Sequence, residues 1–497
     1  MEDRYIATVD LGTAKLALSV ARITGDNAEI IYYKERPSDG VRYGCIFNPT
    51  KASVPLKEAI KEAEDELGIK VTQVVIGVPR YGVSQEIASA SLDRSDAEAC
   101  ITQEEIDCIK DMALDSYPLA DAEKQEIYGA SAQSFSTDDS INCTEEDVVG
   151  MPSAVLQGNF KIFIGVKKAS RNIDIMLNKA DVALARKYFL PPLTAEAVLS
   201  SEEKENGVAL IEMGAGVTSI TIYQGSILRY YHAIPFGGRS ITNDIKLECG
   251  FTEKLAENIK LGFGACMPDK LQTMSDKILQ IVDEENGTDQ QLPVKYLSEI
   301  ITARVREIVD AILYLIQESG YADRLRNGVV LTGGCANLAG CANLIKEMSG
   351  YNVRIGFPRA KKFSFSGCAG IGETDAASTI GMLLYAREDR HLNCIEEVTG
   401  GGTAPATHAT LGTVRGGTVS KANGGVERSE TVSGTVTAPG NTEGSVFDQA
   451  EWEVKQEKKQ KPQKTERKDN FLVRWTKKSL KAGEDFVGGL YDKMEEN

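Results

Sequence analysis

The sequence predicts an α/β fold built from two duplicated halves that face one another across a cleft. Apolar stretches at residues 5–9 and 16–23 read as two strands joined by a tight polar turn. The same order of strand, acid, glycine and second strand returns at residues 208–223. A helical pattern at 56–67 and an apolar strand at 74–78 follow the first hairpin, as expected for alternating strands and helices.

Composition excludes several classes of protein. Of 497 residues, 42% are hydrophobic and 26% are charged, which is typical of a soluble globular chain. Ten cysteines occur without a CxxC pair, and there are only three histidines. We therefore expect no disulfide scaffold, no zinc site and no histidine-based triad. The net charge of −16 argues against nucleic-acid binding.

Three regions differ in composition. Residues 1–395 alternate apolar and polar segments and are expected to fold. Residues 396–469 are first rich in glycine and threonine and then basic, and they are too poor in large apolar groups to offset the entropy of ordering. We expect a flexible linker there. Helical periodicity returns at 470–495.

The folded region itself divides at an insertion. Residues 82–165 mix short strands, one helix at 103–114 and an acidic loop, and they interrupt the first half. We therefore expect the first half at 1–81 and 166–206, an inserted subdomain at 82–165, and the second half at 207–395.

The first hairpin turn carries residues suited to phosphate. Gly12 lets the backbone approach a ligand closely, and Thr13 with successive backbone N–H groups can cradle phosphate oxygens. Asp10 can hold Mg²⁺, and Lys15 can neutralise phosphate charge. Taken alone, this pattern also occurs in ordinary turns.

The second hairpin offers a matching turn. Glu212, Gly214, Gly216 and Thr218 can present another set of backbone N–H groups from the opposite side. The alternative is a glycine-rich hairpin selected for turn geometry.

Two further segments suit a nucleoside. An apolar strand at 329–332 ends at Gly333 and Gly334 and is followed by Asn337, which favours close packing of a ligand on backbone. Glu257 and Lys260 are three residues apart on one helix face and can bracket a ribose and adenine, although a surface ion pair explains the same spacing.

In this order and spacing, the four segments resemble the actin-superfamily ATPases. The resemblance implies ATP and Mg²⁺ as ligands. It also places residues 194–200 at the superfamily's connecting helix, where Glu196 falls at the position that orients attacking water, and residues 374–381 at the second connecting helix. With Asp10, Glu196 is the catalytic candidate.

Within that superfamily the chain resembles the FtsA family of bacterial cell-division proteins. The opening at residues 9–15, the stretch 235–245 and the later 262–264 are typical of it, and so is an insertion at 82–165. The resemblance also implies a small subdomain at about 230–310 that contacts the tubulin-like protein FtsZ. The superfamily resemblance also implies Glu212 as a second metal ligand. It stands where most superfamily members have Asp, so the sequence leaves open whether ATP is hydrolysed slowly or only bound.

The C-terminal segment predicts a membrane-surface helix. On a helical wheel its large apolar side chains fall in one half and its basic side chains in the other, as in interfacial helices. Residues 454–481 carry eleven Lys and Arg against three Asp and Glu. The alternative is a helix that docks on protein. The candidate membrane-binding residues are Phe471, Leu472, Trp475, Lys477, Lys478, Lys481, Phe486 and Leu490.

The resemblance implies a function at the cytoplasmic face of the inner membrane, at the division septum. There the chain would bind ATP, polymerise on anionic lipid, anchor the FtsZ ring through the C-terminal tail of FtsZ and recruit later division proteins. Two alternatives remain open at this point, a membrane scaffold of the pilus-assembly type and a small-metabolite kinase of the same superfamily.

Overall fold

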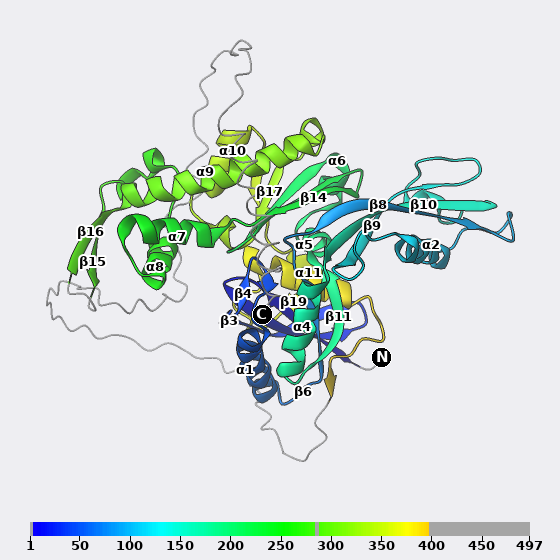
Figure 1. Cartoon of the computed structure of the whole chain (residues 1–497), viewed down its shortest axis with the longest axis horizontal. Coiled ribbons are helices and arrows are strands. Elements are labelled where there is room, and N and C mark those ends of the chain that lie inside the picture. The colour runs from blue at the N-terminus through cyan, green and yellow to red at the C-terminus, as the bar shows by residue number, and fades with distance from the viewer. Residues whose placement is uncertain (1–2, 284–287, 397–497) are drawn as a thin grey trace, which may run out of the picture.

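The computed structural model describes residues 3–283 and 288–396 (Figure 1). The expected linker from residue 397 onward and the expected helix at 470–495, with Phe471, Trp475 and the other candidate membrane-binding residues, lie outside these ranges. Within the described ranges, no helix is long and apolar enough to cross a bilayer.

The first half is built on a six-stranded sheet in the order β11-β7-β1-β2-β3-β19. The antiparallel hairpin β1–β2 lies at its centre, and β7 pairs parallel to β1. Most apolar side chains of β1 and β2 are buried, because helices cover both faces of the sheet. Its strands are β1 (Arg4–Leu11), β2 (Lys15–Thr24), β3 (Asn27–Pro37), β7 (Gln73–Val78), β11 (Ala183–Phe189) and β19 (Ser364–Phe365).

The second half repeats this topology. Its sheet has the order β14-β13-β12-β17-β18, in which the first two neighbouring pairs are antiparallel and the last two are parallel. In the first sheet, the strands β3-β2-β1-β7-β11 pair in the same sequence of directions. The predicted α/β fold with two duplicated halves is therefore confirmed. The strands are β12 (Val208–Met213), β13 (Thr218–Gln224), β14 (Ile227–Ile234), β17 (Val329–Thr332) and β18 (Val353–Ile355).

Helices cover the outer faces and fill the space between the sheets. Helix α1 begins earlier than the pattern at 56–67 predicts, because Asn48 caps its N-terminus and Pro49 occupies its first turn. Helices α5 and α11 pack together between the two sheets (Figure 1). The helices are α1 (Pro49–Leu67), α4 (Lys167–Lys179), α5 (Leu190–Val198), α6 (Ser201–Asn206), α7 (Gly238–Cys249), α8 (Glu253–Phe263), α9 (Val294–Glu318), α10 (Cys341–Ser349) and α11 (Ala377–Ala386).

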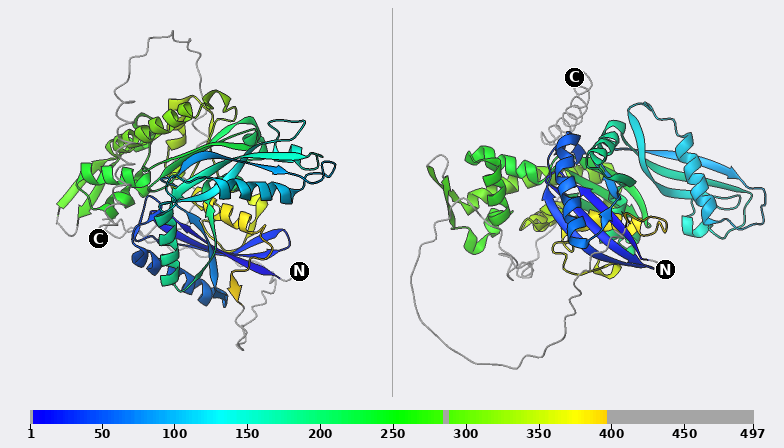
Figure 2. Two further views of the ribbon diagram at one scale, coloured as in Figure 1. Left: turned by 45° about the vertical axis from the view of Figure 1, so that its right-hand side comes forward. Right: turned by 90° about the horizontal axis from the view of Figure 1, so that it is seen from below.

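Two smaller sheets lie at opposite ends of the long axis. One is the three-stranded sheet β8-β10-β9, which packs on α2 with a hydrophobic core of its own. The other is the hairpin β15–β16, beside α7 and α8 (Figures 1 and 2). Their elements are β8 (Ser84–Asp93), α2 (Gln103–Ser116), β9 (Gln125–Ser136), α3 (Glu145–Val148), β10 (Val155–Val166), β15 (Ile278–Asp283) and β16 (Thr288–Pro293).

The chain crosses from the first half to the second after α5 and returns to the first half after β18. We call these two connecting segments the chain passages, and they are hydrogen-bonded to each other. The backbone N–H of Arg359 donates to the carbonyl of Ala197 at 2.9 Å, and the Arg359 guanidinium donates to the carbonyl of Leu199 at 3.0 Å. Short pairs complete the fold, formed by β4 (Val41–Arg42) with β5 (Cys45–Ile46) and by β6 (Lys70–Val71) with β20 (Ile395–Glu396).

Candidate functional site

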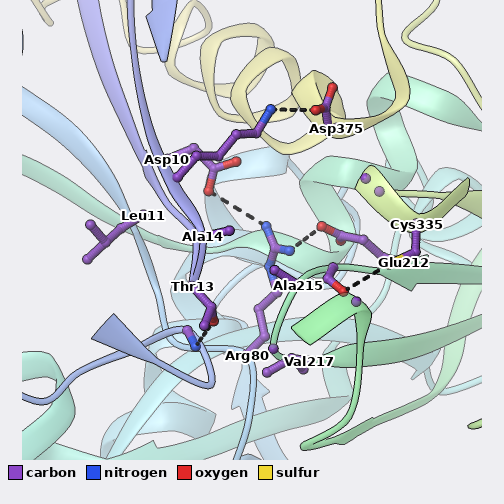
Figure 3. Close-up of a pocket in the computed structure, with 18 of the residues that line it drawn as sticks. Asp10, Leu11, Thr13, Ala14, Arg80, Glu212, Ala215, Val217, Cys335 and Asp375 are labelled. Atoms are coloured by element: carbon purple, nitrogen blue, oxygen red, sulfur yellow. Dashed lines mark hydrogen bonds and ion pairs between the residues drawn. The ribbon is translucent and has the colours of Figure 1, made fainter. Parts of the chain in front are cut away.

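A cavity of about 400 Å³ lies between the two halves, and both predicted hairpin turns line it (Figure 3). This volume falls in the range of small-molecule and cofactor sites. The twelve predicted site residues that line it are Asp10, Gly12, Thr13, Lys15, Glu212, Gly214, Gly216, Glu257, Lys260, Gly333, Gly334 and Asn337.

The two hairpin turns have the same backbone geometry. The N–H of Gly12 donates to the carbonyl of Lys15 at 2.9 Å, and the N–H of Gly214 donates to the carbonyl of Val217 at 2.9 Å. The turns also meet, since a Cβ atom added at Gly216 would lie 2.5 Å from Oγ1 of Thr13. The cavity is therefore bounded by two opposed turns that can direct backbone N–H groups toward one anion.

Two predicted site residues do not line the cavity. Thr218 is the first residue of β13, and its buried hydroxyl donates to the carbonyl of Phe236 at 2.8 Å. Glu196 lies on a face of α5 beside the chain passages, where its carboxylate pairs with Lys204 and Lys362. Burial opposes ionisation of Glu196, but Lys204 and Lys362 outweigh it and lower the pKa of that carboxyl. Both side chains thus have structural partners in place of a ligand.

Helix α8 contributes one end of the cavity. Nζ of Lys260 lies 2.8 Å from Oε2 of Glu257, 2.8 Å from the hydroxyl of Thr242 and 3.0 Å from the carbonyl of Gly238. The Thr242 hydroxyl in turn contacts Glu257. The Glu257–Lys260 pair is therefore an ion pair that also lines the cavity. The two interpretations of this spacing, an ion pair and a nucleoside-binding pair, are thus compatible.

The glycine pair after β17 closes the adjoining wall. Gly333 has a φ of 87°, and a Cβ there would lie 2.7 Å from the carbonyl oxygen of Met213. Its carbonyl accepts from the Thr374 hydroxyl at 3.0 Å. Cys335 follows, and burial raises the pKa of its thiol to about 12. Glycine is thus required here by both backbone conformation and close approach.

Lys15 reaches across the cavity mouth toward α11. Its Nζ lies 2.5 Å from Oδ2 of Asp375 and 2.5 Å from Oε1 of Glu35. Burial alone would lower the pKa of Lys15, but Asp375 and Glu35 outweigh it and raise that pKa. Lys15 therefore remains a cation at the edge of the cavity.

Arg80 lies between the two carboxylates that the sequence assigns to metal (Figure 3). Its guanidinium contacts Glu212 and Ser378, the latter at 2.6 Å, and Nη2 lies 3.9 Å from Oδ1 of Asp10. The backbone of Arg80 is also held, because its carbonyl accepts from the Tyr231 hydroxyl at 2.5 Å. Burial, opposed by Arg80 and reinforced by Glu212, raises the pKa of Asp10.

The sequence reasoning missed Arg80, Asp375 and Cys335, all of which line the cavity. Arg80 lies two residues after the end of β7, which runs parallel to β1 and ends at the same edge as Asp10. That placement was a usable signal. Asp375 lies in the segment assigned to the second connecting helix, but nothing in its spacing points to Lys15.

As arranged here, the residues do not fit the expected magnesium ion. The Glu212 carboxylate contacts the Arg80 guanidinium and accepts from the Ser378 hydroxyl at 3.0 Å. Across residues 3–283 and 288–396, no group of three or more His, Cys, Asp or Glu side chains is placed to hold a metal ion.

Comparison with known proteins supports the family resemblance. A family model described as "Cell division protein FtsA" matches residues 209–380. The FtsA of Borreliella burgdorferi is 28% identical over 404 residues, which cover 80% of this chain and 95% of that protein. The FtsA of Neisseria meningitidis is 27% identical over 362 residues, covering 72% and 85% of the two chains.

The resemblance to FtsA is confirmed. The similarity extends well beyond the second half that the family model matches, since the FtsA relatives align over 72–80% of this chain. A chain of the solved PilM–PilN type IV pilus biogenesis complex has a TM-score of 0.55 at 14% identity, covering 77% of this chain and 98% of that one. This last likeness shows the shared fold alone, and the sequence relatives are FtsA proteins.

Proposed function

We propose that this chain is an ATP-binding, actin-like cell-division protein. In this proposal it assembles into filaments on the cytoplasmic face of the inner membrane at the division septum. There it anchors the FtsZ ring through the C-terminal tail of FtsZ and recruits later divisome proteins. The observation that carries the proposal is the similarity to FtsA along 95% of a curated relative.

ATP suits the chemistry of the cavity. Two opposed turns can direct backbone N–H groups at its phosphates, and Lys15 and Arg80 add cationic donors on the same side. The walls formed by α8 and by Gly333 and Gly334 then receive the nucleoside. The phosphates lie between the turns, so the ligand bridges the two halves of the fold.

A kinase acting on a small metabolite is less well supported. Such an enzyme needs a positioned general base near the transferred phosphoryl group. The four acidic side chains discussed in the cavity all face cations: Asp10 and Glu212 face Arg80, Glu257 faces Lys260, and Asp375 faces Lys15. In this proposal ATP is a ligand that favours assembly, whether it is hydrolysed slowly or only bound.

Membrane attachment rests on the sequence of residues 470–495. Reversible binding by one amphipathic helix becomes firm when many protomers are linked, because the later binding events are intramolecular. Filament assembly thus converts weak single anchors into stable attachment. The basic side chains Lys477, Lys478 and Lys481 each add about 1 kcal/mol near anionic lipid.

Co-sedimentation of the full-length protein with anionic liposomes tests this function. With ATP present, the protein is expected in the liposome pellet and to carry FtsZ with it, whereas FtsZ lacking its C-terminal tail stays in the supernatant. Trp475→Glu should release the protein from liposomes, while the matched Trp452→Glu in the basic linker should not. Failure to carry intact FtsZ would refute the anchoring role.

A further inference from the structure

Arg80 connects the two halves of the fold at the cavity. It follows β7 of the first half and contacts Glu212 on β12 of the second half, while its Nη2 lies 3.9 Å from Asp10 on β1. The arginine side chain is 20% exposed, and the two carboxylates are 17% and 9% exposed. A partly buried cation therefore lies between two acids of opposite hairpins, of which Glu212 is buried and Asp10 is partly buried.

A divalent cation at this place would need the oxygens that Arg80 now contacts. Magnesium binds through carboxylates, water and phosphate oxygens. Arginine keeps its charge under all physiological conditions and carries five N–H donors. The contacts to Glu212, Ser378 and Asp10 engage three of them at most, which leaves donors for a phosphate oxygen.

We propose that Arg80 takes the place of a divalent cation in this cleft, so that the chain binds ATP without metal. The inference rests on the ATP binding proposed above. The guanidinium neutralises Glu212, joins the two hairpins and presents its remaining N–H groups to the phosphates. Planar guanidinium groups bind phosphate by paired, charge-assisted hydrogen bonds, which is the chemistry required here.

The local charge balance identifies Asp10 as the residue whose substitution distinguishes a metal-dependent ATP site from one in which Arg80 replaces the metal. Pairing Arg80 with Glu212, Lys15 with Asp375 and Lys260 with Glu257 leaves Asp10 as the carboxylate whose nearest cation is 3.9 Å away. In a metal site Asp10 attracts the ion and assists ATP. In a site served by Arg80 it only repels phosphate.

The first experiment measures ATP binding by the full-length wild-type protein with excess EDTA and with excess Mg²⁺. The proposal expects the two affinities to agree within about threefold. Binding seen only with Mg²⁺ overturns the proposal and leaves the ATP-binding function standing. No binding under either condition refutes the ATP-binding function itself, so the two failures are distinguishable.

Substitutions then test the residues. Arg80→Gln should weaken binding in EDTA by about tenfold or more, because a charge-assisted contact is lost, and added Mg²⁺ should restore part of the loss. The matched control Arg22→Gln removes a surface arginine paired with Glu29 and should bind as wild type. Equal binding by Arg80→Gln and wild type in EDTA contradicts the proposal.

Asp10→Asn should change ATP affinity in opposite directions in a metal-free site and in a metal-dependent site. This test does not depend on the folding of the Arg80 variant. The proposal expects ATP binding in EDTA to strengthen by about threefold or more, since a negative charge near phosphate is removed. A metal-dependent site expects the same variant to weaken binding in Mg²⁺. Weakened binding under both conditions overturns the proposal.

Discussion

Thr13 and Gly216 touch across the cleft, and no side-chain carbon fits between them. A Cβ at Gly216 would lie 2.5 Å from Oγ1 and 2.9 Å from Cγ2 of Thr13. Thr13 cannot easily give way, because its hydroxyl accepts from the N–H of Gly44 at 2.9 Å. This contact therefore limits how closely the two turns can approach one another.

Gly216→Ala is expected to push the turns apart and weaken ATP binding by about tenfold, equivalent to about 1.4 kcal/mol. A fluorescence titration with a labelled ATP analogue would measure it. Gly262→Ala is the matched control, because its added Cβ meets nothing within 4 Å and alanine favours the helix by up to about 1 kcal/mol. Unchanged affinity in Gly216→Ala would show that ATP does not span the turns.

Glu196→Gln should leave ATP binding unchanged, since this side chain does not line the cavity. It should lower the free energy of unfolding by about 1 kcal/mol, because buried Lys204 loses its charged partner while Glu196 itself is 53% exposed. A urea titration measures this loss. A strong reduction of ATP turnover, with stability intact, would restore Glu196 as the residue that aligns water.

The Glu196 pairing also predicts a pH dependence. The pKa of Glu196 is lowered in the folded chain from its ordinary value of 4.5. Its contribution to stability is therefore present above pH 4.5 and is lost as the pH falls through the lower folded value. The difference in stability between wild type and Glu196→Gln should accordingly shrink in acid, as denaturation at a series of pH values would show.

Cys335 should react slowly with alkylating reagents at neutral pH. The thiolate is the reactive form, and the pKa of about 12 keeps the thiol protonated. Its labelling rate should rise about tenfold per pH unit until the pH approaches 12, and ATP should suppress it because Cys335 lines the cavity. Exposed Cys108 serves as the internal control in peptide mass mapping. Rapid labelling of Cys335 at pH 7 would contradict this assignment.

Gly381→Ala should strongly destabilise the fold. A Cβ at Gly381 on α11 would lie 2.3 Å from the carbonyl oxygen of Leu193 on α5, where both partners are held within helices. We expect a loss of about 3 kcal/mol, at the upper end of overpacking effects. Urea denaturation would measure it, with Gly372→Ala as a control because nothing lies within 4 Å of its added Cβ. A loss below about 1 kcal/mol would show that the helices can separate.

The sequence predicted the fold and the two turns because both depend on local patterns. The strands around Gly12 and Gly214 alternate or bury apolar residues in ways that a short window reveals. The contacts of Arg80 with Asp10 and Glu212 could not be read in this way, since they join residues 70 and 132 positions apart. Such a contact follows only once parallel pairing brings β7 beside β1.

Two predicted site residues, Thr218 and Glu196, do not line the cavity, although residues that do line it lie on the same hairpin or helix. Thr218 follows Val217, which lines the cavity, but it faces into the fold. Glu196 lies on a helix that does contribute Leu190 to the cavity wall, but six residues along α5 its side chain faces the chain passages. The sequence therefore identified the hairpin and the helix that line the cavity. Only the structure shows in which direction the side chains of Thr218 and Glu196 point.

The adjoining chain passages link the two halves of the fold at one place, and the β8-β10-β9 sheet links them at another, because Nε2 of Gln133 on β9 donates to the carbonyl of Leu228 on β14 at 2.9 Å. At the chain passages, Arg359 and Ala197 are joined by a backbone hydrogen bond of 2.9 Å, so neither crossing can shift without the other. A movement of one half against the other would therefore strain both links at once. The β15–β16 hairpin lies at the opposite end of the long axis from the β8-β10-β9 sheet (Figure 2). The width of the cleft is thus restrained by contacts on its far side as well as by the chain passages.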